Sequence, residues 1–273
     1  MAGKLYLVGT PIGNLGDLSP RAAKTLTDAD FIAAEDTRVT LKLLNFIGIK
    51  KPMLSYYEHN KKARGGEIIE RILKGENCAL VTDAGMPAIS DPGEDMVKLA
   101  YENNITVESV PGPSAVVTAL AISGMPSGRF TFEGFLTVNK AGRKAHLNEI
   151  KTEKRTMIFY EAPHKLLATL SDMLNVFGDR KIALVRELTK IHEEVIHTTL
   201  SEAVEKYSVS EPKGEFVIIV SGYVEEEKVY SLEEAVALAG EFYKNGDGAS
   251  LAAKKAAEIT KIKKGDIYKG MNL

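Results

Sequence analysis

The stretch VTDAGMPAISDPG, residues 81–93, decides how the first part of this chain folds. An apolar run, Cys78–Val81, ends abruptly at this stretch, and a helical pattern begins at Glu94. The pattern predicts a strand that opens into a long, stiff loop, because Gly85 permits a positive φ while the prolines fix φ and withhold donors. An ordinary strand-to-helix turn is usually far shorter. Since α/β sheets bind ligands at the carboxyl ends of parallel strands, this loop indicates a ligand site.

Strand-like and helical patterns alternate on both sides of the loop, an order typical of a mostly parallel α/β sheet. The expected strands are 5–8, 31–34, 53–57, 79–82 and 106–110, and the expected helices are 19–27, one containing 68–73, 94–103 and one following Pro113. A second α/β unit is expected after the turn-rich segment Gly124–Gly128. Its expected strands are 130–136, 157–160, 182–185, 195–199 and 216–220, with a helix after Pro163, in a sheet of mixed direction.

The fold class is therefore α/β, with two α/β domains and a small helical domain. We place the domains at 1–124, 125–224 and 229–273, with a charged linker at 225–228. In the last domain, Leu232–Tyr243 shows the spacing of one helix face, and Ser250 is expected to cap a second helix. The residues expected to pack there are Ala252, Ala256, Ile259, Ile267 and Tyr268. Such short helices resemble a helix-turn-helix element, although plain packing appendages look the same.

Charge is distributed unevenly along the chain. The whole chain carries −2, but residues 250–273 hold six lysines against two acids, a balance of +4. The lysines are Lys254, Lys255, Lys261, Lys263, Lys264 and Lys269. A basic tail on a near-neutral body indicates contact with a polyanion. A lysine-rich solvated helix has the same composition, so both interpretations stay open.

The composition is that of a globular protein, with 44% hydrophobic and 26% charged residues. No apolar run approaches the ~20 residues needed to span a bilayer, so no membrane contact is expected. We see no secretory signal, and the single cysteine, Cys78, fits a reducing cytoplasm. Because Cys78 lies in an apolar strand, a buried, inert thiol is expected rather than a nucleophile.

Other strand ends carry polar or charged motifs. VGTPIGNLGDLS (8–19) is neither a Walker A motif nor GxGxxG, so it predicts a stiff wall beside a small-molecule pocket. VPGPSA (110–115) offers free amides at a helix start. AEDTR (34–38) and SYYEHN (55–60) could bind substrate or could be structural ion pairs and half-buried strand residues. HEEVIH (192–197) is one residue too long for HExxH and is expected in a strand, so no metal site is predicted.

Taken in order, the motifs VGTPIGNL, AEDTR, TDAGMPAISDPG, VPGPSA, FYEAPHK, RELTK and GEFVIIV closely resemble the ribosomal small-subunit RNA (cytidine) 2′-O-methyltransferase I family of the tetrapyrrole (corrin/porphyrin) methylase superfamily. The resemblance runs from about residue 4 to residue 220. It implies two α/β domains with S-adenosylmethionine in the cleft between them, no metal, and a homodimer. It also implies methyl transfer to the ribose 2′-hydroxyl of a cytidine in small-subunit (16S) ribosomal RNA, near the decoding centre.

The resemblance also assigns the cofactor loops. The implied cofactor-binding residues are Thr10, Pro11, Asp83, Gly85, Met86, Pro87, Ile89, Ser90, Ser114, Ala115, Phe159, Tyr160, Leu188 and Thr189. Because a 2′-hydroxyl is a poor nucleophile, a base near it would help. The catalytic candidates on strand-end loops are Glu35, Asp36, Arg38, Glu58, His59 and Glu187. The candidates for holding RNA phosphate are Arg38, Arg186, Lys254, Lys255, Lys261, Lys263 and Lys264.

Two other classes of protein stay open. A tetrapyrrole C-methylase would share the fold and cofactor but take a macrocyclic substrate, and the basic tail and AEDTR argue against it. A non-catalytic RNA-binding protein would need no cofactor loops, and the well-formed loop set argues against that class. The expected partner is ribosomal RNA or the small ribosomal subunit.

Overall fold

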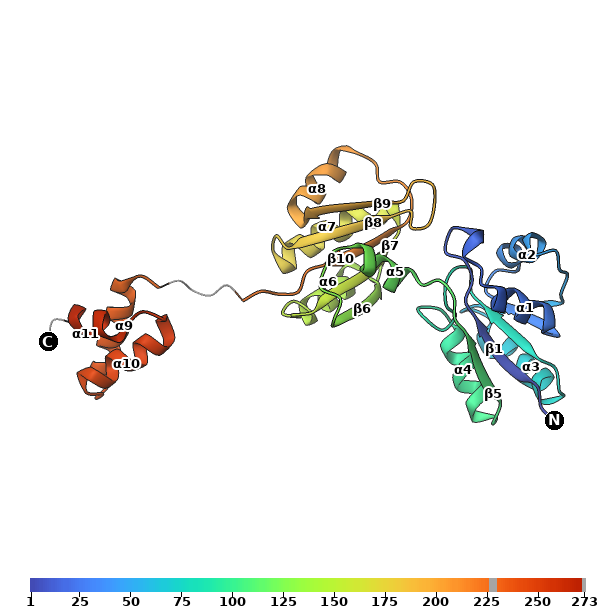
Figure 1. Cartoon of the computed structure of the whole chain (residues 1–273), viewed down its shortest axis with the longest axis horizontal. Coiled ribbons are helices and arrows are strands. Elements are labelled where there is room, and N and C mark those ends of the chain that lie inside the picture. The colour runs from blue at the N-terminus through green and yellow to red at the C-terminus, as the bar shows by residue number, and fades with distance from the viewer. Residues whose placement is uncertain (226–229, 272–273) are drawn as a thin grey trace. The chain divides into compact units, whose positions relative to one another are not determined.

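The computed structural model describes residues 1–225 and 230–271, and the chain divides into two compact units, 1–223 and 224–273 (Figure 1). Each unit is described by itself. Of the predicted linker at 225–228, residues 226–228 lie outside the described residues. The predicted division of unit 1 into domains at residue 124 stays a prediction, but unit 1 does contain two separate sheets.

The first sheet is entirely parallel, with strand order β3-β2-β4-β1-β5. Its strands are β1 (Lys4–Val8), β2 (Phe31–Ala34), β3 (Met53–Ser55), β4 (Cys78–Val81) and β5 (Thr106–Val110). Its helices are α1 (Pro20–Asp28), α2 (Thr37–Phe46), α3 (Lys61–Leu73) and α4 (Gly93–Glu102), with a short 3-10 helix η1 (Leu15–Asp17). The predicted strand, loop and helix around residues 81–93 are confirmed, since β4 ends at Val81 and α4 begins at Gly93.

Hydrophobic layers cover both faces of this sheet. Phe31 and Leu80 pack with Ile68 of α3 on one face, while Ile32 and Val81 pack with helices on the other. All residues of β2 and β4 are buried, as expected for central parallel strands. Cys78 is fully buried in the first layer, and burial raises the pKa of its thiol to about 12. The prediction of a buried cysteine is confirmed.

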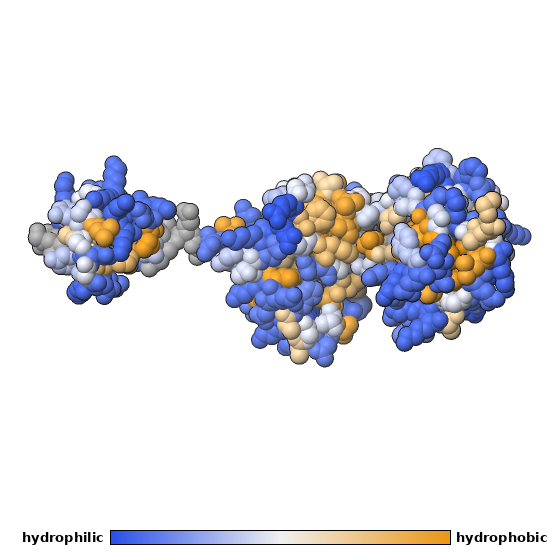
Figure 2. Space-filling model, turned by 90° about the horizontal axis from the view of Figure 1, so that it is seen from below, coloured by the Kyte–Doolittle hydropathy of each residue, from blue (hydrophilic) through white to orange (hydrophobic). Residues whose placement is uncertain are grey.

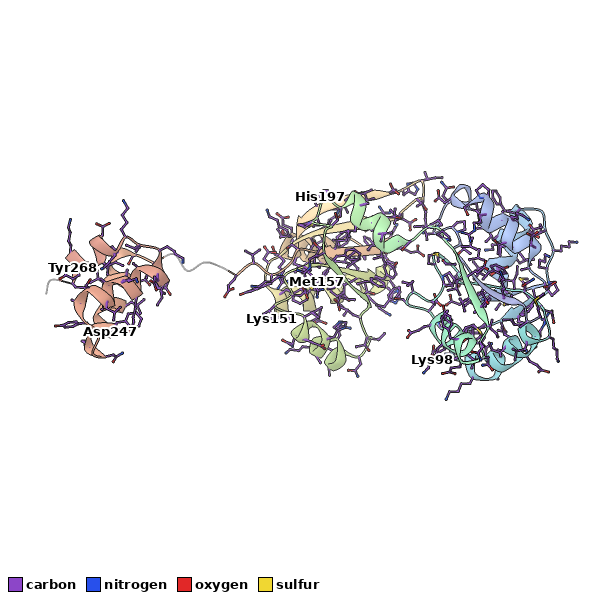
Figure 3. The ribbon with its side chains drawn as sticks, turned by 60° about the horizontal axis from the view of Figure 1, so that its bottom comes forward. Lys98, Lys151, Met157, His197, Asp247 and Tyr268 are labelled. Carbon is purple, nitrogen blue, oxygen red and sulfur yellow. The ribbon has the colours of Figure 1, made fainter. Side chains whose placement is uncertain are left out.

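The second sheet has the order β6-β7-β10-β8-β9. Only β6 and β7 run parallel, and the other neighbours are antiparallel, which confirms the predicted mixed direction. The strands are β6 (Phe130–Phe135), β7 (Thr156–Glu161), β8 (Lys181–Arg186), β9 (Glu194–Thr199) and β10 (Phe216–Val220), and the helices are α6 (Lys140–Glu149), α7 (Pro163–Phe177) and α8 (Leu200–Val209). The three helices cover one face, where Met157 lies in the core (Figure 3).

Helix α5 (Ala115–Ile122) covers the other face of the second sheet. Val116 and Leu120 pack there against Ile158 and Val217. His197 of β9, beside this helix in Figure 3, donates a hydrogen bond from its Nε2 to the Ser123 carbonyl at 2.8 Å. The helix that follows β5 in the chain therefore completes the second core.

Three α-helices of unit 1 were not predicted from the sequence. Helix α2 begins directly after the motif AEDTR, because the Asp36 carboxylate caps it by accepting from the Arg38 amide at 2.8 Å. Helix α6 is rich in charged residues and buries only Leu147, so it lacks a strong apolar stripe. Helix α8 carries a capping box at Thr199, directly after β9 with no intervening turn.

Unit 2 is a bundle of three short helices, α9 (Leu232–Lys244), α10 (Ala249–Thr260) and α11 (Lys264–Gly270). Its small core consists of four alanines and Ile267, all fully buried. The connection between α10 and α11 is only three residues long, as in helix-turn-helix elements. No described helix of either unit is long and apolar enough to cross a bilayer.

Three details predicted for unit 2 are wrong. Ser250 does not cap α10, since the N-cap is Gly248 and Ser250 lies in the first turn. Ile259 and Tyr268 do not pack in the core, being 49% exposed each. The alanines at 253 and 256 allow the helices to approach closely, so the core is complete without these two larger side chains.

Candidate active site

Unit 1 contains a cavity of about 510 Å³ at the edge where β4, β5, β6 and β7 end. Both sheets contribute: Asp83, Met86 and Ser114 follow strands of the first, and Tyr160 and Val217 belong to the second. Because β10 runs antiparallel to β7, its start reaches the same edge. The volume falls in the range of ~300–1,000 Å³ typical of small-molecule sites.

The 82–92 loop is fixed to the end of β1 by a two-way backbone pairing. The Thr10 amide donates to the Gly85 carbonyl at 2.9 Å, and the Gly85 amide donates to the Thr10 carbonyl at 3.1 Å. Gly85 has φ +88°, a conformation that a residue with a side chain rarely adopts. The Thr10 hydroxyl also donates to the Thr82 carbonyl at 3.2 Å. The loop is therefore preformed.

Backbone strain marks the next part of the same loop. Ala88 and Ser90 have φ of +69° and +63°. The Asp91 carboxylate fastens this part of the loop by accepting from the amides of Ala88 at 2.9 Å and Gly93 at 2.7 Å. Burial raises the pKa of Asp91, and these amides oppose that rise. Strained residues held by their surroundings cluster at functional sites.

A second strained loop flanks the cavity after β8. Glu187 and Thr189 have φ of +51° and +66°, and Leu188 between them lines the cavity. The Glu187 carboxylate accepts from the Glu215 amide at 3.0 Å and from the Lys190 ammonium at 2.9 Å. These two donors lower the pKa of Glu187. Glu187 therefore fastens this loop to the start of β10.

Apart from Tyr160, the ionisable side chains among the described residues that line the cavity are carboxylic acids. They are Glu35, Asp83, Asp91, Glu161 and Glu215, and no Lys, Arg or His is among the described lining residues. Glu161 is 4% exposed and accepts from the Thr169 hydroxyl at 2.6 Å. Such a lining favours a ligand with positive charge and disfavours one that places anionic groups inside.

Glu35 and Asp83 form an acidic pair on the cavity wall. Glu35 Oε2 accepts from the Thr82 hydroxyl at 2.5 Å and from the Asp83 amide at 3.3 Å. Asp83 in turn accepts from the Asp36 amide at 3.0 Å. Burial, and then the neighbouring Glu35 charge, raise the pKa of Asp83. The arrangement leaves Glu35 Oε1 without a hydrogen-bond donor among the described residues.

Residues 4–204 match the family Tetrapyrrole (Corrin/Porphyrin) Methylases. A Synechocystis protein named Ribosomal RNA small subunit methyltransferase I is 44% identical over 268 residues, 97% of this chain and 96% of that protein. The chain belongs to this methyltransferase family. The family resemblance predicted from the motifs is thereby confirmed.

A family member from Thermotoga maritima with the same name is 48% identical over 220 residues, which are 81% of this chain but 99% of that protein. Among solved structures, the Thermus thermophilus uroporphyrin-III C-methyltransferase complexed with S-adenyl homocysteine has a TM-score of 0.57 at 20% identity, covering 80% of this chain and 97% of that chain. At this identity the likeness shows the fold, and it agrees with the predicted fold class.

Most cofactor residues implied by the family lie at the cavity. Those that line it are Asp83, Gly85, Met86, Ile89, Ser90, Ser114, Ala115, Tyr160 and Leu188. Thr10 supports the loop from behind, and Phe159 points into the opposite core because side chains alternate along β7. Pro11, Pro87 and Thr189 adjoin lining residues without being among them. These assignments remain predictions.

Only one predicted catalytic residue, Glu35, lines the cavity. The Asp36 carboxylate binds the Arg38 guanidinium at 2.6 Å, which lowers the pKa of Asp36 to about 2, and the Arg38 side chain is 87% exposed. Glu58 pairs with Lys61 at 2.7 Å, and His59 contacts Tyr57 edge-on. The Glu187 carboxylate accepts from the Glu215 amide and the Lys190 ammonium. The structure therefore brings none of the other five catalytic candidates into the cavity lining.

Several lining residues were not singled out from the sequence. They are Ile12, Thr82, Ala84, Asp91, Phe135, Glu161, Ala162, Pro163, Val185, Glu215, Phe216 and Val217. Most lie inside the quoted motifs, so the motifs carried a usable signal. Phe135 and the start of β10 depend on strand pairing, which no local pattern reveals.

The predicted RNA-binding residues are dispersed. Arg186 donates to the Lys213 carbonyl at 2.6 Å and contacts Glu194 at 3.3 Å, in a small groove of about 190 Å³. In unit 2, Lys255 pairs with Asp247 at 2.7 Å, and Lys264 donates to the Ser250 hydroxyl at 2.8 Å. The remaining candidates, Lys254, Lys261 and Lys263, are exposed. Hydrophilic residues cover most of the face of this unit drawn in Figure 2.

Proposed function

We propose that this chain transfers the methyl group of S-adenosylmethionine to the ribose 2′-hydroxyl of a cytidine in 16S ribosomal RNA, near the decoding centre, in the cytoplasm. The observation that carries the proposal is the acidic, preformed cavity at the strand ends of unit 1. The names of the relatives supply the class of substrate. The choice of the 2′-hydroxyl as the methyl acceptor, and of a cytidine near the decoding centre as the target nucleotide, comes from the family resemblance.

The residues at the cavity suit this cofactor. S-adenosylmethionine carries a sulfonium and an ammonium, which the lining carboxylates favour. Ser114 caps α5 without a side-chain hydrogen bond to it, so the Ala115 amide at the start of the helix is available to the carboxylate of the cofactor. Tyr160, Val185 and Val217 provide an apolar wall. When bound, the cofactor supplies an electrophilic methyl group.

Glu35 is our choice for the base that receives the ribose proton. It lies on the cavity wall, and Thr82 and Asp83 hold one of its oxygens in place. The other oxygen can accept from a hydroxyl of the substrate. Positioning of the hydroxyl in line with the methyl group supplies much of the remaining rate.

The cavity lining also bears on the alternative of a tetrapyrrole substrate. Uroporphyrin-type macrocycles carry several carboxylates that would enter the cavity with the ring, next to the acidic pair of Glu35 and Asp83. An RNA substrate needs to insert only one ribose and base, while its phosphates stay at the surface. The lining therefore favours RNA.

We also propose a homodimer, as the family resemblance implies. Hydrophobic residues gather in patches on unit 1 in Figure 2. On α5, Val117 and Ile122 are 53% and 40% exposed. These apolar groups give a second copy a surface to cover.

The protein is expected to bind S-adenosylmethionine without added metal. Calorimetry in the presence of a chelator measures this binding, and S-adenosylhomocysteine should compete. No heat at millimolar cofactor, with the protein folded by circular dichroism, would refute the proposal. Binding that appears only when the chelator is omitted would show that the site needs a metal.

Removal of residues 230–273 is expected to leave a folded, cofactor-binding enzyme with weaker RNA binding. Unit 2 has its own core, and the Thermotoga maritima relative leaves unmatched about as many residues as this unit contains. Phosphate contacts make RNA affinity salt-dependent, so the slope of affinity against salt should fall by ~0.7 for each phosphate that unit 2 neutralises in the full chain. The measurement is RNA affinity against salt for both proteins.

The matched control neutralises three exposed lysines of the full chain, with Lys254→Gln, Lys261→Gln and Lys263→Gln combined. It should reduce the slope while keeping unit 2 folded. Equal slopes for all three proteins would show that the lysines form only a solvated surface. An insoluble truncation would show that unit 2 supports the fold of unit 1.

A further inference from the structure

An exposed aromatic side chain borders the cavity and belongs to none of the buried cores. Phe135 ends β6, lines the cavity and is 59% exposed. Ile89, on the 82–92 loop, also lines the cavity and is 52% exposed, and Val138, three residues after Phe135, is 70% exposed. Apolar side chains that remain exposed around a pocket indicate a binding surface.

A bulge in β6 turns Phe135 toward the cavity. The register of β6 with β7 shifts between Phe132 and Gly134, so Glu133 is the extra residue. In a regular strand, residues three apart point to opposite faces. The bulge places Phe132 and Phe135 on the same face, both in contact with Tyr160. Bulges next to active sites commonly redirect a side chain in this way.

The bulge also brings β6 against the strained loop. Gly134 has φ +63°, and a Cβ on it would lie 3.4 Å from the Ser90 hydroxyl oxygen. The end of β6 and the loop that carries Ile89 are therefore neighbours. Phe135 and Ile89 approach the cavity from two separate elements.

The ring of Phe135 is supported from behind. Its centroid lies 5.3 Å from that of Tyr160, whose ring meets Phe132 edge-on at 5.0 Å. The support holds Phe135 in place while leaving more than half of its surface open.

Two exposed lysines follow Phe135 closely in the chain. Lys140 and Lys144 lie on the first turns of α6, five and nine residues after Phe135, and both are exposed. Neither forms an ion pair with another residue that the structure describes. An aromatic side chain binds a base by stacking, and lysines that follow it in the chain can bind the backbone of the same strand by charge.

We propose that Phe135 is the platform on which the base of the target nucleotide stacks while its ribose enters the cavity. The inference rests on the proposed RNA-methylating function. A ribose can reach an enclosed methyl donor only if its nucleotide is splayed out of the strand, which costs the stacking energy of its base. Stacking of the base on the Phe135 ring compensates for the stacking energy that the base loses.

The test compares Phe135→Ala, Phe135→Leu and Phe135→Trp, with small ribosomal subunits from cells that lack the enzyme as the probe. Phe135→Ala should raise KM for subunits about 5- to 150-fold, the equivalent of ~1–3 kcal/mol per stacked base. Phe135→Leu keeps an apolar side chain without a π face and should resemble Phe135→Ala. Phe135→Trp should restore KM. The dissociation constant of S-adenosylmethionine should be unchanged in all three.

Phe46→Ala is the matched control, because Phe46 is 56% exposed at the end of α2 and does not line the cavity. It should leave KM unchanged. Weaker cofactor binding in Phe135→Ala would show that the ring packs on the cofactor, and an unchanged KM would show that it has no substrate role. A shift from dimer to monomer would assign Phe135 to a subunit interface. Each of these three results overturns the inference about Phe135, provided that the wild-type protein methylates the subunits. A wild-type protein that does not methylate the subunits would instead overturn the proposed function.

Discussion

Glu35→Gln is expected to lower kcat for methyl transfer by about 10²- to 10⁴-fold, the range typical of a lost general base. The amide keeps the size of the side chain and can still accept from the Thr82 hydroxyl, but it cannot receive a proton. Cofactor affinity is expected to change little, because the other four lining acids remain. Single-turnover kinetics with small ribosomal subunits, together with calorimetry of cofactor binding, measure the two effects separately.

Glu58→Gln serves as the control. Glu58 is an acid at the end of a neighbouring strand, but its side chain is 64% exposed and paired with Lys61 outside the cavity lining. This variant should keep kcat. Normal turnover by Glu35→Gln would exclude Glu35 as the base and leave Asp83 as the next carboxylate on the wall. Loss of cofactor binding without a kinetic effect would assign Glu35 to the cofactor.

Gly85→Val is expected to weaken S-adenosylmethionine binding by about 5- to 150-fold, since a non-glycine residue in a strained backbone conformation costs ~1–3 kcal/mol. An added Cβ by itself would make only ordinary contacts, 3.5 Å from Ile12 and 3.6 Å from the Pro113 carbonyl. The conflict is with the backbone, since φ is +88° and both amide and carbonyl pair with Thr10. A β-branched residue must break that pairing and shift the cavity wall.

Gly48→Val provides the same kind of strain away from the cavity. Gly48 has φ +73° after α2, and an added Cβ would meet no atom within 4 Å. It should lower the melting temperature to a similar degree as Gly85→Val while leaving cofactor affinity intact. Calorimetry and thermal melts on both variants check this. Normal binding by Gly85→Val, or its complete unfolding, would show that Gly85 is only a turn glycine.

The apolar runs predicted the strands of both sheets well, because central strands such as β2, β4 and β10 are buried along their whole length. Phe31–Ala34, Thr106–Val110 and Phe216–Val220 have the predicted bounds. The 82–92 loop was equally clear, since its glycine and prolines exclude both helix and strand. These features depend on local sequence, so one chain was enough to predict them.

Local sequence could not predict which of two neighbouring charged side chains lines the cavity. Glu35 and Asp36 are adjacent in the chain, yet one lines the cavity and the other caps α2. Which of them reaches the cavity depends on where β2 stops and α2 starts. That boundary is set by the Asp36 cap and by the Arg38 pair, and a shift of one residue would exchange their roles.

The second-sheet side of the cavity depends on contacts distant in sequence. Glu215, Phe216 and Val217 reach the cavity because β10 pairs antiparallel with β7 and β8. Phe135 does so because of the bulge at Glu133. Neither strand order nor a one-residue bulge has a signature in hydrophobic periodicity, so the structure was needed to show that these residues reach the cavity.

The central claim is that this chain methylates a ribose of small-subunit ribosomal RNA. Mapping of ribose methylation in cells that lack the protein tests it most directly. The account predicts that one cytidine near the decoding centre loses its 2′-O-methyl group, and that purified protein with S-adenosylmethionine restores it on isolated subunits. An unchanged ribose-methylation map, or restored methyl groups found on a base, would contradict the account.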